Sequence, residues 1–358
     1  MKNLTFIVFI SIHISLFTIH LNSQPCLPVG ITFTTQAEID NFQVNYPGCT
    51  EIEGDVTIGE WPGSDITNFN GLSVLISIDG RLTICYNDLL TDLSGLENLN
   101  SIGNGLIVEN NESLKNLSGI NNVTSIDGLI IIYKNNDLTS LTGLEGLTSI
   151  ESLHVCGSLP SNPSLLSLEG LNNVIYVVDQ LYICWNVSLQ NLSGLDNLTT
   201  IGGGLLIKSN NNLVNLYGLD NLTSVGGSIS IGGYNIDAMP GGLNCEGNAI
   251  LGDITALSNL TNIEGTLLIS CNDALTNLSG LESLTSIGGQ LRIGFAMEDI
   301  TGVQLAGSPF LADITGLTGI SSIGGNLEIQ GNVSLTSLAG LGNIEVNSIE
   351  NLVIGFNN

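Results

Sequence analysis

Hydrophobic residues recur along the chain with a period of 24 residues. The unit reads L-x-x-L-x-G-L-x-x-L-x-x-I-x-G-x-L-x-I-x-x-N, and residues 189–210 are one clean copy of it. Longer gaps between copies mark insertions near 235–249 and 296–309. The central glycine position of the repeat is held by Gly71, Gly95, Gly119, Gly143, Gly170, Gly194, Gly218, Ala256, Gly280, Gly316 and Gly340. Self-similarity of this length is the signature of a solenoid of stacked units.

Each part of the unit predicts a local structure. The L-x-I segment predicts a very short strand with both aliphatic side chains pointing inward, because successive side chains of a strand alternate between its faces. The three-residue Leu spacing before it suits short 3₁₀ or polyproline turns. We attribute the glycine before the strand, such as Gly203, to a turn with positive φ. The asparagine after it, such as Asn210, is expected to adopt left-handed backbone and to bond the neighbouring coil through its amide.

Stacking is what makes such a unit stable, since a single copy cannot bury its apolar edge. The strands then pair in parallel at about 4.8 Å per coil. The predicted fold class is an all-β solenoid, a right-handed single-stranded β-helix of about twelve 24-residue coils with an N-terminal capping helix. Its length would be roughly 55–60 Å at that spacing. An ordinary α/β domain does not explain so many positions in register.

The first 23 residues have the pattern of a secretory signal peptide. Lys2 is followed by a mainly apolar stretch over 4–21 and by a small residue, Ser23, where a peptidase would cut. The alternative is an uncleaved membrane anchor, because the stretch is just long enough to span a bilayer. Polar residues interrupt it, which favours cleavage. No later segment is long and apolar enough to span, so we expect a secreted or cell-surface protein.

Residues 24–50 are predicted to form an N-terminal cap, and 51–358 the repeat solenoid. Thr35 and Glu38 have the spacing of a capping box. Cys26 precedes this short helix, and Cys49 leads straight into the first coil at 52–58. The chain stops at Asn358 within a repeat, and an apolar end without a polar cap is typical of a fragment of a longer protein.

This arrangement of Cys, short helix, Cys and L-x-I-x-x-N coils resembles the receptor L-domain family, which is leucine-rich-repeat-like. The regular 24-residue step is more similar to its bacterial cell-surface members than to animal receptors. The chain departs from the family in having more coils than one usual L domain and no cysteine-rich module, membrane span or kinase. The resemblance implies an ectodomain that binds a ligand or partner, and not a catalyst.

Seven cysteines in an exported chain suggest disulfides with one thiol left over. Cys156 and Cys184 each follow the inward strand residue of consecutive coils. A separation of about 4.8 Å per coil suits a disulfide. Cys85 lies three coils from Cys156, too far to pair, and is predicted to be the free thiol. The remaining four cysteines are expected to pair as Cys26–Cys49, across the capping helix, and Cys245–Cys271, at the first insertion.

Composition excludes some partners. The 358 residues include 33 Asp and Glu but only 6 Lys and Arg, giving a net charge of −27. A nucleic-acid binder needs clustered bases, which are absent here, and adhesion to an anionic membrane surface is disfavoured for the same reason. The chain is 43% hydrophobic but only 5% aromatic, so Leu, Ile and Val must fill its core.

Catalytic chemistry finds little support in the sequence. Once the leader is removed, His154 is the only histidine, no G-x-S-x-G elbow accompanies it, and the bases are spread singly over different coils. There is no C-x-x-C, which argues against a metal site. We therefore expect no catalytic residue, metal or cofactor. Paired carboxylates, which a carbohydrate-active β-helix enzyme would use, stay open as an alternative.

The residue between the two inward aliphatics of each strand must face outward, and several of these are apolar. Aromatic residues gather where the strands end, and four bases fall in the same strip. The predicted binding face comprises Arg81, Tyr86, Ile107, Ile131, Tyr133, Lys134, Tyr182, Trp185, Leu206, Lys208, Leu268, Arg292 and Phe295. Exposed apolar patches with polar rims mark interaction sites. The alternative is that outward Ile and Leu merely favour β structure.

A second set of residues forms a predicted acidic ridge on another edge: Glu97, Glu145, Asp196, Asp220 and Glu282. We interpret it as a solvated surface, with weak calcium binding as a minority hypothesis. The sequence thus favours an extracellular recognition or adhesion protein that binds a protein or glycan. A polysaccharide lyase or hydrolase and a passive structural surface protein are the alternatives.

Overall fold

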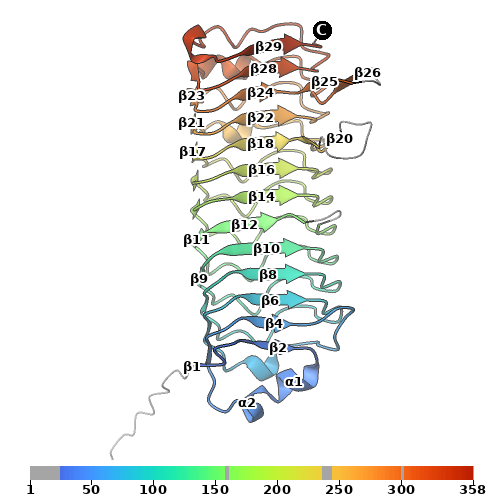
Figure 1. The fold of residues 1–358 in the computed structure, drawn as a ribbon, viewed down its shortest axis with the longest axis vertical. Coiled ribbons are helices and arrows are strands. Elements are labelled where there is room, and N and C mark those ends of the chain that lie inside the picture. Colours follow the sequence, from blue (N-terminus) through green and yellow to red (C-terminus); the bar gives the residue numbers. More distant parts are fainter. Residues whose placement is uncertain (1–24, 158–160, 236–243, 300–301, 358) are drawn as a thin grey trace, which may run out of the picture.

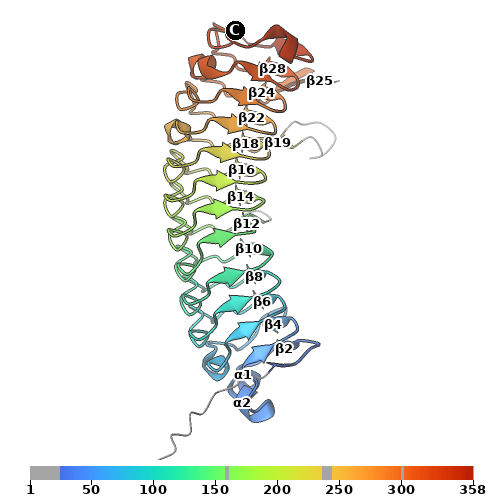
Figure 2. The same cartoon turned by 90° about the vertical axis from the view of Figure 1, so that its left-hand side faces the viewer.

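The structure is a computed structural model that describes residues 25–157, 161–235, 244–299 and 302–357. It is a parallel β-solenoid in which one sheet runs the whole length of the molecule (Figures 1 and 2). The thirteen strands of this main sheet, in spatial order, are β2 (Ile31–Phe33), β4 (Val56–Ile58), β6 (Leu82–Cys85), β8 (Leu106–Glu109), β10 (Leu129–Tyr133), β12 (Ser152–Val155), β14 (Leu181–Cys184), β16 (Leu205–Lys208), β18 (Ile229–Gly232), β22 (Leu267–Ser270), β24 (Leu291–Ile293), β28 (Leu327–Gln330) and β29 (Leu352–Gly355).

The predicted all-β solenoid is confirmed, with thirteen turns where the repeat count gave twelve. The additional strand is β2 in the N-terminal cap, which pairs in parallel with β4. The cap helices are α1 (Gln36–Asp40) and α2 (Phe42–Asn45). Thr35 and Glu38 make the predicted capping box, and Ile39 and Phe42 are buried under the first coils. The cap therefore seals one end of the apolar column.

Every coil except the last, which contains β29, also has a second, two-residue strand that the sequence did not predict. These strands form two further parallel sheets along another side of the molecule. The first contains β1 (Pro25–Cys26), β3 (Glu51–Ile52), β5 (Ser77–Ile78), β7 (Ser101–Ile102) and β9 (Ser125–Ile126). The second contains β11 (Ser149–Ile150), β13 (Tyr176–Val177), β15 (Thr200–Ile201), β17 (Ser224–Val225), β21 (Asn262–Ile263), β23 (Ser286–Ile287) and β27 (Ser322–Ile323).

The remaining elements are short 3₁₀ turns and two hairpins. The 3₁₀ turns are η1 (Asn70–Leu72), η2 (Thr255–Leu257), η3 (Thr315–Gly319) and η4 (Val346–Ser348). The first hairpin joins β19 (Tyr234–Asn235) to β20 (Asn244–Cys245), and the second joins β25 (Ala296–Asp299) to β26 (Gly302–Leu305). Both lie beside the ends of the main-sheet strands, at the right of Figure 1.

The core is one continuous column of aliphatic side chains. In the coil that begins at Leu189, the repeat residues Leu192, Leu198, Ile201 and Ile207 all have 0% exposure. The same positions of neighbouring coils belong to a single buried cluster. Burial of this kind is the main stabilising contribution to the stack, since each coil shields the apolar edge of the next.

The glycine before the strand has the predicted positive φ at Gly128 (φ +84°), but in most coils it has a different role. Gly203 does not have a positive φ. A Cβ atom added to it would lie 2.3 Å from Asp179 Oδ1 and 2.5 Å from Asp179 O, so glycine is required by the close approach of two coils. The positive φ occurs instead at the central glycine of the repeat, such as Gly194 (φ +107°).

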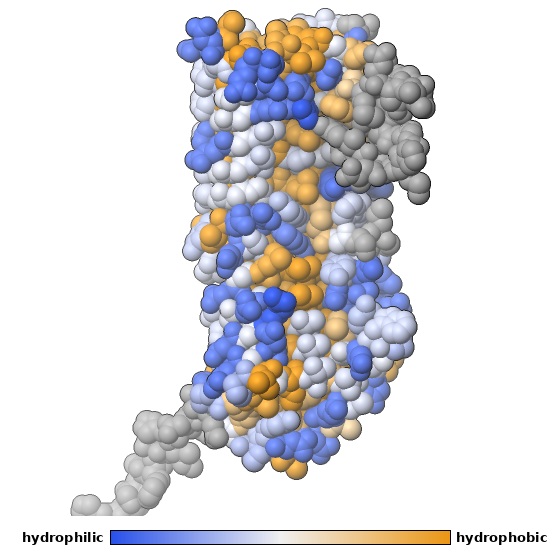
Figure 3. Space-filling model, viewed as in Figure 1, coloured by the Kyte–Doolittle hydropathy of each residue, from blue (hydrophilic) through white to orange (hydrophobic). Residues whose placement is uncertain are grey.

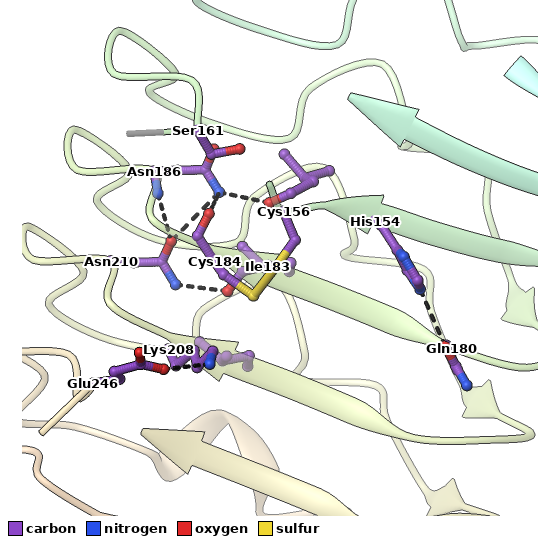
Figure 4. Close-up of a disulfide and its surroundings, with 12 residues drawn as sticks. His154, Cys156, Ser161, Gln180, Ile183, Cys184, Asn186, Lys208, Asn210 and Glu246 are labelled. Atoms are coloured by element: carbon purple, nitrogen blue, oxygen red, sulfur yellow. Dashed lines mark hydrogen bonds and ion pairs between the residues drawn. A yellow bond between two sulfur atoms is a disulfide. The ribbon is translucent and has the colours of Figure 1, made fainter. Parts of the chain in front are cut away.

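The asparagine after the strand forms a buried ladder. Asn186 Nδ2 donates to Val155 O at 2.9 Å in the preceding coil, and Asn186 N donates to Asn210 Oδ1 at 3.1 Å in the next (Figure 4). Bonding to the neighbouring coil is thus confirmed, but the left-handed residue is the one before it, such as Trp185 (φ +58°). The asparagines with 0% exposure are Asn87, Asn111, Asn135, Asn162, Asn186, Asn210, Asn248, Asn272 and Asn332.

Candidate functional site

The outward side chains of the main sheet form one aligned column. The pairing register places Ile107 opposite Ile131, Ile131 opposite His154, His154 opposite Tyr182 and Tyr182 opposite Leu206. All five side chains are partly exposed. Figure 3 shows hydrophobic patches along the face of the sheet, with hydrophilic residues between and beside them. We call these five residues the central column. Leu268 continues the line beyond Ser230.

Two aromatic rings stack at the middle of this column. The rings of His154 and Tyr182 lie 4.6 Å apart with an interplanar angle of 11°. His154 Nε2 lies 3.2 Å from Gln180 Oε1. Burial lowers the pKa of His154, opposed by the Gln180 hydrogen bond and by the Asp179 carboxylate. Burial and Asp179 both raise the pKa of the Tyr182 phenol. At neutral pH this platform is therefore flat and uncharged.

Trp185 and Lys208 lie together at the ends of β14 and β16. The Lys208 ammonium is 4.8 Å from the centre of the Trp185 ring, a cation–π contact. Lys208 also forms an ion pair with Glu246, which follows β20 (Figure 4). The first insertion thus places a carboxylate on the predicted binding face.

Arg292 has a similar environment on β24. Its Nε lies 2.7 Å from Glu328 Oε2 on β28, and its guanidinium carbon is 5.5 Å from the Phe295 ring centre. The sequence suggested a basic sheet face separated from an acidic ridge. That separation is wrong for these bases, because Glu246 and Glu328 neutralise Lys208 and Arg292. The apolar and aromatic character is what distinguishes the face.

The acidic ridge has a structural role that the repeat pattern did not indicate. Gly194 N donates to Asp196 Oδ2 at 2.8 Å, and the same bond to the side chain two residues later occurs at Gly95, Gly143, Gly218 and Gly280. Asn121 and Asn172 replace the acid in two coils and accept the same bond. The ridge carboxylates therefore fix the turn at the positive-φ glycine.

All three predicted disulfides are confirmed. Their Cα–Cα distances are 5.7 Å for Cys26–Cys49, 4.6 Å for Cys156–Cys184 and 5.6 Å for Cys245–Cys271. The Cys156–Cys184 bridge joins consecutive coils beside the central column (Figure 4). Cys85 is the free thiol and is buried. Burial, together with the Glu109 carboxylate, raises its pKa to about 11.

The other predicted face residues are not in the central column. Arg81 is exposed, and Tyr133 packs against Gly157, where an added Cβ would lie 2.4 Å from the Tyr133 ring. Tyr86 and Lys134 line an open cavity of about 350 Å³ beside the ends of the first strands, together with Trp61. Trp61 lies in an irregular turn outside the repeat pattern, so the repeat did not indicate it as a site residue.

Within the described ranges, no group of three or more His, Cys, Asp or Glu side chains is arranged to hold a metal ion. His154 is the one histidine among the described residues, and its ring stacks on Tyr182 and lies within hydrogen-bond distance of Gln180. No helix in the described part of the chain is long and apolar enough to cross a membrane. The predicted leader, 1–23, lies outside the described residues.

Comparison with protein-family models and with curated proteins gives no match to this chain. Among solved structures, the chain is similar to a leucine-rich repeat protein from Bacteroides ovatus. The two are 16% identical, the alignment covers 92% of each chain, and the TM-score is 0.19. With so low a TM-score, the assignment of this chain as a leucine-rich β-solenoid rests on its own repeats and strand pairings.

Proposed function

We propose that this protein is a non-catalytic recognition or adhesion protein that binds a protein or glycan partner on the face of its main sheet. The observation that carries the proposal is the central column from Ile107 to Leu206, which leaves apolar and aromatic side chains partly exposed in one unbroken line. Contiguous apolar surface of this kind is uncommon on a monomer unless it binds something.

The chemistry of the column suits binding better than catalysis. Tyr and other flat aromatic side chains supply contact area at low entropic cost, and they dominate the binding energy of interfaces. The stacked His154 and Tyr182 rings are already ordered before a partner arrives, which lowers the cost of binding. A long, ordered sheet face also suits an extended ligand.

The proposed location is the cell exterior. Three disulfides support it, because such bonds persist in oxidising compartments. The secretory pattern of residues 1–23 and the resemblance to receptor L domains, which are ectodomains, point the same way.

The test is a binding screen followed by paired variants. The protein is first applied to a glycan array and to a panel of displayed extracellular proteins. Tyr182→Ala combined with Leu206→Asp should weaken any partner found by about thirtyfold or more, as expected for the centre of an interface. Its thermal midpoint should stay close to that of the parent, because both side chains point out of the core.

The control removes an aromatic and an aliphatic side chain elsewhere on the surface. Val214 and Tyr217 are 47% and 53% exposed and belong to no strand of the main sheet. Val214→Asp with Tyr217→Ala should leave binding unchanged. The proposal would be contradicted if both double variants lost partner binding equally or if the face variant kept it. It would also be contradicted if neither screen gave a ligand with saturable binding.

A further inference from the structure

The open cavity lies where the coils turn away from the main sheet after β4, β6, β8 and β10. Its volume of about 350 Å³ falls within the roughly 300–1,000 Å³ of small-molecule sites. Trp61 lies at its rim with 73% of its surface exposed. A tryptophan with this much exposed apolar area beside a cavity is typical of a ligand contact.

The cavity is held in place by the repeat. Tyr86, Asn110 and Lys134 occupy equivalent positions of three successive coils, each with left-handed backbone at φ 57°, 54° and 56°. The Trp61 turn is tied to this wall because Ser64 N donates to Tyr86 O at 3.0 Å. The repeat backbone and this hydrogen bond thus fix the walls of the cavity.

Polar side chains line the rest of the cavity. Two residues further along each coil, Asp88, Glu112 and Asn136 again occupy equivalent positions. Among the described residues, the side chains of these three and of Asn110 make no hydrogen bond or ion pair. The buried asparagines one residue away are fully paired instead. The cavity therefore presents free acceptors and free donors around two aromatic rings.

We propose that this cavity binds a neutral saccharide unit, as a second site distinct from the central column. Sugar hydroxyls both donate and accept, so the carboxylates can accept from them while the amides and the Lys134 ammonium donate. The C–H face of a pyranose can lie against Trp61 or Tyr86, whose ring faces carry partial negative charge.

The charged side chains that line the cavity disfavour both anionic and cationic ligands. An anionic ligand would meet Asp88 and Glu112 against one lysine, Lys134, and would be repelled. A cationic ligand such as a quaternary ammonium could use the aromatic rings and the acids, but the Lys134 ammonium opposes it. A neutral, hydroxyl-rich group is the class that all these side chains can bind together.

The experiment is calorimetric titration of the protein with neutral tetrasaccharides: cellotetraose, mannotetraose, laminaritetraose and chitotetraose. At least one should give saturable heat. Trp61→Ala should weaken its binding by roughly tenfold or more, and Asp88→Asn or Glu112→Gln by several-fold, since each removes a stacking face or a charge-assisted bond. Asp273→Asn is the matched control, because Asp273 occupies the position of Asp88 in a distant coil, and it should have no effect.

Failure of the cavity proposal can be distinguished from failure of the proposed binding on the face of the main sheet. The Tyr182→Ala, Leu206→Asp variant should bind the tetrasaccharide as the parent does. Four results would overturn the cavity site: no heat with any of the neutral sugars, binding that survives Trp61→Ala, binding lost only in the sheet-face variant, or preferential saturation by tetramethylammonium or tetragalacturonate. Thermal midpoints of all variants identify any that fail to fold.

Discussion

The asparagine ladder predicts a large cost for removing one buried side chain. Asn186 has 0% exposure and lies between the coils that carry His154 and Leu206. Its Nδ2 donates to Val155 O at 2.9 Å, to Cys184 O at 3.1 Å and, more weakly, to Asn210 Oδ1 at 3.5 Å. Its Oδ1 accepts from Asn162 Nδ2 at 3.1 Å. Asn186→Ala deletes all of these bonds.

The magnitude follows from the number and burial of those bonds. A net contribution of about 1 kcal/mol per hydrogen bond, with an added cost for buried carbonyls left without a donor, gives roughly 3–5 kcal/mol. Asn186→Asp keeps the shape but turns the donor into a second acceptor facing two carbonyl oxygens. We expect it to destabilise at least as strongly as alanine, because the second oxygen of the buried carboxylate would face carbonyl oxygens and have no donor.

Hydrogen exchange measured by mass spectrometry is the suitable assay, since a long repeat array need not unfold in one step. In Asn186→Ala, peptides covering β12, β14 and β16 should exchange faster, while those covering β4 and β6 should change little. Asn211→Ala, an exposed asparagine in the next coil, is the control. The structural role of the ladder would be refuted if Asn186→Ala changed the free energy of local opening by less than about 0.5 kcal/mol, or by no more than the control does.

Three further predictions follow from single residues. Asp196→Ala should lower the free energy of unfolding by about 1–2 kcal/mol by removing the acceptor for Gly194 N. Asp196→Asn should be nearly neutral in the same denaturation measurement, because Asn121 accepts that bond in another coil; equal loss in both variants would contradict this. Cys85 is buried with a pKa of about 11, so iodoacetamide at pH 8 should label it only after unfolding, and rapid labelling of the native chain would contradict its position. The lowered pKa of His154 means that the folded chain binds this proton less readily than the unfolded chain, whose histidine pKa is about 6.5. The contribution of neutral His154 to stability should be complete above about pH 6.5 and be lost as the pH falls through the folded-state pKa. His154→Gln should therefore reduce the change in thermal midpoint between pH 7 and pH 5. An unchanged pH dependence of the midpoint would refute this.

The repeat made the fold predictable. Leu and Ile at fixed spacings determine which side chains point inward, and the strand register then places the outward residues and the paired cysteines. That is why Cys156–Cys184 could be paired and the column from Ile107 to Leu206 located from the sequence. Both depend on positions that recur in every coil.

What the sequence did not predict depends on contacts between coils or on parts outside the repeat. Gly203 is required by the approach of Asp179 from the preceding coil, which a single unit does not reveal. Glu246 reaches Lys208 only because the insertion folds back beside the strand ends. Trp61 belongs to a turn without a counterpart in later coils, so no periodic signal pointed to its cavity.

Hydroxyl-radical footprinting of the protein bound to a partner from the array tests the recognition face most directly. Tyr182 on the central column and Tyr217 on another edge provide two tyrosines for comparison in the same sample. If the central column is the binding face, oxidation of Tyr182 should fall several-fold in the complex while oxidation of Tyr217 is unchanged. Protection of Tyr217 with Tyr182 unaffected would contradict it.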